Sequence, residues 1–83
     1  MATKWFDMWY EDKQSMVSTM LKNMQSDIEA GYNPLGGCIR NQHMQIDRYM
    51  KEFDYQMEKL ADKTEEQAER WCYMDLKRRG AIS

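Results

Sequence analysis

Two residues between Tyr32 and the middle of the chain suggest nucleophilic chemistry: Cys38 as a thiol and His43 as its base. A cysteine beside a helix start faces unpaired N–H groups and the positive end of the helix dipole, which favour a reactive thiolate. On one helix, however, residues five apart point about 140° away from each other around the axis. We therefore expect a turn without catalysis, with a redox or regulatory role of Cys38 as the alternative.

The same residues fall short of a metal site. Cys38, His43 and Cys72 are the soft or borderline ligands of the chain, which is one fewer than a closed zinc site requires, and none forms a short-spaced ligand pair. Gly36 and Gly37 precede a helix, but the glycine-rich patterns that bind phosphate are absent. The sequence therefore predicts no metal, no cofactor and no enzymatic activity.

A cluster of cations near the C-terminus supports a different kind of site. Lys77, Arg78 and Arg79 stand directly before Gly80, where cations complement the negative end of a helix dipole and glycine ends the helix. Together with Arg70, the cluster offers contacts for nucleic-acid phosphates. The formal net charge of −2 does not favour a polyanionic partner. Nucleic-acid binding is therefore the alternative function, and its residues would be Arg70, Lys77, Arg78 and Arg79.

The densest apolar segment is Trp5-Phe6-Asp7-Met8-Trp9-Tyr10. Its large side chains cannot all face one core, because a helix turns about 100° per residue. Trp and Tyr are also the types that anchor protein interfaces. Two interpretations stay open: the aromatic residues pack on the second helix and its flank, or they bind a partner. The predicted partner-binding residues are Trp5, Phe6, Trp9, Tyr10, Trp71 and Met74.

Two helices joined by a turn must position these residues. Apolar residues recur at helical spacing from Trp5 to Ile28, which predicts a helix over about 4–30, and Gly31 ends it. Asn33-Pro34 and Gly36-Gly37 predict a turn over 31–38. A second helix over about 39–79 follows from a heptad-like seam of Ile39, His43, Ile46, Met50, Phe53, Met57 and Leu60, with His43 as a polar register-setting residue.

The second helix has two alternatives. An unbroken helix would be about 60 Å long against about 40 Å for the first, and a second subunit would then cover Trp71 and Met74 in a homodimer. Thr64-Glu65-Glu66-Gln67, in contrast, reads as a capping box, which would start a third helix and give a three-helix bundle broken near 62–64. Strong helix formers around Thr64 favour the unbroken helix.

The composition places the chain in a broad class. The 83 residues predict a single all-α domain, a helical hairpin or a small three-helix bundle, with 42% hydrophobic residues to fill a core. Two cysteines predict a reducing, cytoplasmic location, and no window of the sequence is apolar enough for a membrane. We expect a small interaction protein, an adaptor or inhibitor that binds another protein and forms a homodimer. Chains of this kind include those encoded by phages and mobile elements.

Overall fold

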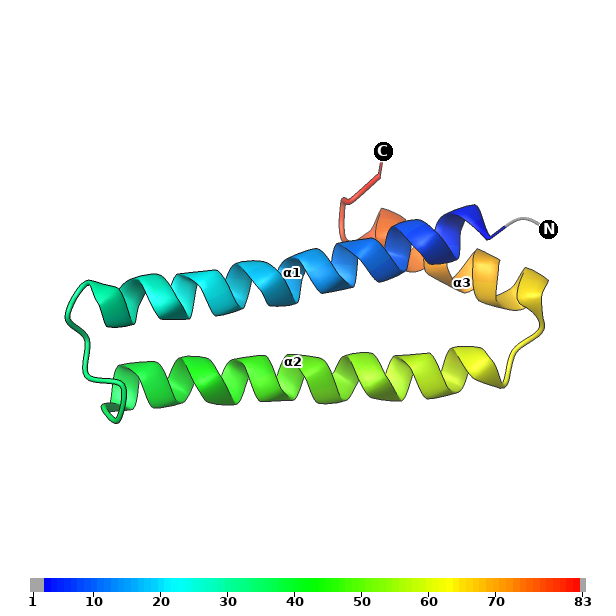
Figure 1. The fold of residues 1–83 in the computed structure, drawn as a ribbon. Helices are drawn as coiled ribbons and strands as arrows, with labels where there is room; N and C mark the ends of the chain where they lie inside the picture. Colours follow the sequence, from blue (N-terminus) through cyan, green and yellow to red (C-terminus); the bar gives the residue numbers. More distant parts are fainter. Residues whose placement is uncertain (1–2, 83) are drawn as a thin grey trace.

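The chain folds into three α-helices, as a computed structural model that describes residues 3–82 shows (Figure 1). Helix α1 spans Lys4–Glu29, α2 spans Gly37–Ala61 and α3 spans Glu65–Arg78. The described residues contain no strand. The predicted all-α fold class is thereby confirmed.

The reversal between α1 and α2 is built by Gly31. Its φ of 107° is open to glycine at little cost, and it lets the N–H of Gly31 bond to the carbonyl of Ile28 and the N–H of Tyr32 bond to that of Asp27. Helix α2 then begins at Gly37, with Gly36 as its N-cap residue. The predicted end of the first helix is confirmed, and the turn is shorter than the predicted 31–38.

Helix α2 ends at Ala61 and a separate helix begins at Glu65. The favoured expectation of one unbroken helix over 39–79 is therefore corrected. The Thr64 hydroxyl accepts a hydrogen bond from the N–H of Gln67 at 3.2 Å, and Oε1 of Gln67 accepts one from the N–H of Thr64 at 3.2 Å. This is the capping box read from the sequence. The cap and the burial of α3 outweigh the helix propensity of the residues around it.

The buried seam of α2 is rotated relative to the predicted one. Ile39, Ile46 and Leu60 are buried as expected, whereas His43 and Met50 are exposed. The half-buried residues Gln42 and Tyr49 join the buried residues of the seam in their place. The polar residues lie in the seam because they have partners on α1: Nε2 of Gln42 donates to Oδ2 of Asp27 at 2.7 Å, and the ring of Tyr49 faces Lys13. His43 consequently has no register-setting role in the core.

Helix α3 packs across the N-terminal half of α1 and brings the aromatic side chains together (Figure 1). The buried core centres on Trp9, Leu60, Cys72 and Leu76. At about 21 Å, α3 covers roughly half of the 39 Å or so of α1, so the far end of the hairpin has two helices only. The radius of gyration of 15.7 Å exceeds the roughly 12 Å of a compact chain of this size, which reflects that extension.

The start of α1 is capped from α3. The N-cap residue Thr3 makes no side-chain cap bond. The Glu69 carboxylate accepts from the N–H of Trp5 at 2.9 Å and from that of Phe6 at 3.3 Å instead. A carboxylate at this position satisfies two unpaired donors and complements the positive end of the helix dipole. The cap therefore fixes the position of α3 on α1.

Candidate functional site

The structure separates the residues that suggested nucleophilic chemistry. Sγ of Cys38 lies 3.9 Å from Nε2 of Gln42, and Nδ1 of His43 lies 3.4 Å from Oδ2 of Asp47. Each side chain thus contacts a residue one turn further along α2, and both are exposed. Cys72 is buried in the core, and burial raises its pKa to about 12. Neither cysteine forms a disulfide bond, and no pair with catalytic geometry results.

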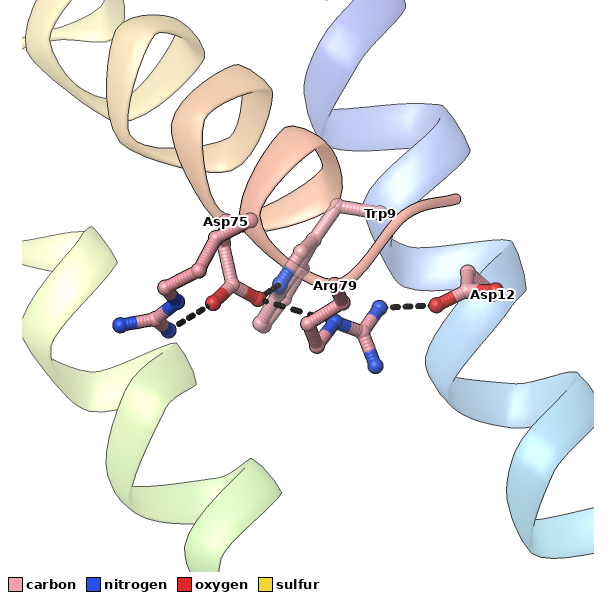
Figure 2. A network of polar contacts seen from close by, with 5 residues as sticks. Trp9, Asp12, Asp75 and Arg79 are labelled. Carbon is pink, nitrogen blue, oxygen red and sulfur yellow. Dashed lines mark hydrogen bonds and ion pairs between the residues drawn. The ribbon is translucent and has the colours of Figure 1, made fainter. Parts of the chain in front are cut away.

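The C-terminal basic cluster divides into arginines that pair with carboxylates and cations that lie at the surface. The guanidinium of Arg79 pairs with Asp12 of α1, and its Nε lies 3.5 Å from Oδ2 of Asp75 (Figure 2). Arg78 also pairs with Asp75. Gly80 ends α3 with a φ of 78°, as its position predicted. Arg78 and Arg79 therefore hold carboxylates of the same chain, while Arg70 and Lys77 stay exposed.

Asp75 is the centre of a polar cluster in the core. Only 4% of this residue is exposed, and Oδ2 accepts a hydrogen bond from Nε1 of the fully buried Trp9 at 2.9 Å (Figure 2). Burial by itself would raise the pKa of Asp75. The hydrogen bonds from Trp9 and Arg78, with the charges of Lys13 and Arg79, lower the pKa below its ordinary value of 3.8. The carboxylate is thus held in its charged form.

Lys13 is a second buried charge next to this cluster. Its Nζ lies 5.7 Å from the ring centroid of Trp9 and 5.3 Å from that of Tyr49, so two aromatic faces contact the ammonium group. Burial and the nearby Arg79 lower the pKa of Lys13, and burial raises that of Tyr49. The Tyr49 hydroxyl is buried near the guanidinium of Arg79. These contacts join α1 to α2 beside the Asp75 cluster.

The predicted aromatic binding segment lies mostly in the core. Trp9 is fully buried, while Trp5, Phe6 and Tyr10 are half-buried against the same core. Trp5 meets Tyr73 edge-on at 4.7 Å between ring centroids, and Trp9 meets Trp71 edge-on at 5.6 Å. The ring of Phe53 is tilted against that of Trp9 at 5.4 Å. Of the two interpretations left open, packing thus applies to Trp9, and Tyr10 keeps one side accessible.

The accessible side of Tyr10 belongs to a groove between α1 and α2, with a volume of about 730 Å³. We call it the helix groove. Its apolar lining includes Leu21 and Met50, which are 44% and 47% exposed. No residue of α3 lines it. The helix groove is lined by Tyr10, Glu11, Gln14, Ser15, Val17, Ser18, Leu21, Met50, Phe53 and Asp54.

Helix α3 presents a basic face of its own to the solvent. Met74 is 59% exposed there, between the exposed Arg70 and Lys77. Trp71, by contrast, turns inward against Trp9 and is half-buried. We call Arg70, Met74 and Lys77 of α3, together with Lys63 in the loop before it, the outer face of α3. Of the two residues assigned to a dimer contact, the structure thus buries most of Trp71 in its own chain and leaves Met74 outside.

Sequence reasoning missed the helix groove and the buried charges. The sequence pattern does not separate Val17, Leu21 and Met50 from core residues, because all are apolar at helical spacing. They stay uncovered only because α3 is too short to reach them. Asp75 and Lys13 lie on helical faces whose charge usually indicates exposure. Asp75 and Arg79 stand four residues apart, a spacing at which opposite charges meet on a helix, but no sequence pattern indicates the bond from Trp9.

Comparison with known proteins gives no assignment: no protein family model, no curated protein and no solved structure matches the chain. Within residues 3–82, no helix is long and apolar enough to cross a membrane. In the same residues, no three His, Cys, Asp or Glu side chains come together as a set of metal ligands. The helix groove and the outer face of α3 are therefore the surfaces on which a functional proposal can rest.

Proposed function

We propose that the protein is a small, non-enzymatic protein–protein interaction module of the adaptor or inhibitor type, acting in the cytoplasm. The observation that carries the proposal is the helix groove, where Leu21 and Met50 stay exposed because α3 does not reach them. Contiguous apolar surface with a polar rim is a mark of binding sites. Binding through a groove between two helices typically takes up the apolar face of a third helix.

The charges of the helix groove define the partner further. Glu11 and Asp54 are its only charged lining residues, and both are acids. A docked helix with Lys or Arg beside its apolar residues would place opposite charges at this rim, and like charges there would be repelled. The partner surface is therefore a basic amphipathic helix.

A photo-cross-linking experiment tests this function. We would place a benzoyl-phenylalanine at Leu21 and, as a matched control, at the exposed Asn41, which lies outside the groove. The protein captured only from Leu21 would be purified, and its affinity measured by calorimetry. Leu21→Asp should weaken that complex at least about tenfold while the helical circular dichroism is unchanged. Equal capture from both positions, or a complex indifferent to Leu21→Asp, would count against the proposal.

Nucleic-acid binding is the alternative, and the exposed Arg70 and Lys77 are the observation that favours it. The pairing of Arg78 and Arg79 with Asp12 and Asp75 speaks against it, because a phosphate would have to compete with these carboxylates. A steeply salt-dependent complex with DNA or RNA that Arg70→Gln and Lys77→Gln weaken would support this alternative instead.

A further inference from the structure

We propose that the helix docked in the helix groove is α3 of a second copy of this chain, and that the two copies form a reciprocal dimer. The proposal rests on the function proposed above and names the partner. Each copy would present its own α3 to the groove of the other. The two surfaces match in shape, in spacing and in charge.

The helix groove has the length to hold a short helix segment. Its wall on α1 runs from Tyr10 to Leu21, which is about 16 Å of helix. The wall on α2 is formed by Met50, Phe53 and Asp54. Two helices in contact leave an open side that a third helix fills in a bundle, and α3 of the same chain packs elsewhere on α1. The open side thus lacks its third helix.

The outer face of α3 has the matching spacing. Arg70, Met74 and Lys77 stand at positions i, i+4 and i+7, which align on one side of a helix over about 10 Å. This length is shorter than the groove wall. The thioether of Met74 adapts to irregular apolar surfaces such as that between Leu21 and Met50. The inner face of the same helix already holds Cys72 and Leu76 in the core, so docking would not compete with folding.

The two surfaces are complementary in charge. Glu11 and Asp54 carry the groove's charge, while the outer face of α3 carries Lys63, Arg70 and Lys77, with Glu66 one turn before Arg70. Because both surfaces belong to one chain, a two-fold axis forms the contact twice. A closed dimer of this kind leaves no surface for further growth. The charge pairs at the rim should chiefly give specificity and a dependence on salt.

Charge reversal on each surface in turn tests the proposal. The groove variant carries Glu11→Lys and Asp54→Lys, and the face variant carries Arg70→Glu and Lys77→Glu. Sedimentation equilibrium of the wild-type full chain should show a dimer of the 10.0 kDa protomer. Each variant alone should raise the dimer dissociation constant by more than about tenfold, because like charges then meet at both contacts. An equimolar mixture should recover a one-to-one heterodimer, in which both contacts regain opposite charges.

Matched controls are Glu29→Lys and Arg48→Glu, which reverse exposed charges outside both surfaces and should leave the dimer intact. Met74→Ser supplies an uncharged second probe and should weaken the dimer as well, since this exposed side chain is not needed for folding. A monomeric wild-type protein, a dimer indifferent to both reversals and to Met74→Ser, or variants that fail to recover on mixing would each overturn the proposal. A monomer that still binds another protein through Leu21 would leave the proposed function standing.

Discussion

Replacing Asp75 by Asn should destabilise the protein strongly, although the two side chains have nearly the same shape. The substitution can keep an acceptor for Nε1 of Trp9, but it removes the charge that faces Arg79, Arg78 and Lys13. A hydrogen bond to a charged group contributes about 1.5 to 3 kcal/mol, and removing one partner of a buried ion pair costs about 3 to 5 kcal/mol. Because Arg78 is largely exposed, we expect a loss of about 3 kcal/mol.

This loss is large relative to the whole stability. A domain of this size has a free energy of unfolding of about 4 to 12 kcal/mol at 25 °C. Urea denaturation followed by tryptophan fluorescence and by circular dichroism would measure the change in unfolding free energy. The midpoint temperature of thermal unfolding should fall by about 12 to 24 °C. Trp9→Phe combined with Asp75→Asn in a double-mutant cycle would separate the part due to the bond between them.

The effect should also depend on pH. The pKa of Asp75 is lowered in the folded protein, so its contribution is present above the ordinary value of 3.8 and disappears as the pH falls through the lower folded value. Plots of unfolding free energy against pH for the wild type and for Asp75→Asn should therefore converge in acid and differ most near neutrality. A difference below about 0.5 kcal/mol at pH 7, typical of a surface substitution, would refute the reasoning.

Three further outcomes test the caps and the thiols. Glu69→Gln should cost about 1 kcal/mol or more of unfolding free energy, because it weakens the cap on α1, and the exposed Glu66→Gln should change it little. Thr64→Ala should cost about 1 kcal/mol by urea denaturation, and an unchanged midpoint would show that the capping box does not hold the break. A thiol reagent should label Cys38 in the native protein and Cys72 only after unfolding; equal rates would contradict the burial of Cys72.

Short sequence motifs predicted the helix ends, because these depend on the backbone chemistry of a few neighbouring residues. Gly31 and Gly80 end their helices because glycine adopts a positive φ at little cost, and each position could be read from the sequence. The capping box at Thr64 was readable too. Whether this capping box would prevail over helix propensity could not be read from the sequence. The break depends on the free energy of burying Cys72 and Leu76 against α1, which no local pattern contains.

The rotation of the α2 seam and the charges of the core depend on partners far away in the sequence. Gln42 replaces His43 in the seam because Asp27 bonds to it across the hairpin. Asp75 is buried because Trp9 and Arg79 offer donors. Residue type alone would place the side chains of Gln42 and Asp75 in the solvent. The helix groove also depends on distant parts of the chain, because it stays open only where α3 is too short to cover it.

The cap on α1 has a consequence for the order in which a nascent chain can fold. Trp5 takes its acceptor from Glu69, 64 residues further along, and Trp9 takes its acceptor from Asp75, 66 residues further along. A ribosome makes the first helix long before it makes either carboxylate. During that interval the aromatic end of α1 has neither its cap nor its core. Helix α1 is thus synthesised well before α3, and Trp5 and Trp9 stay without these acceptors until α3 has emerged.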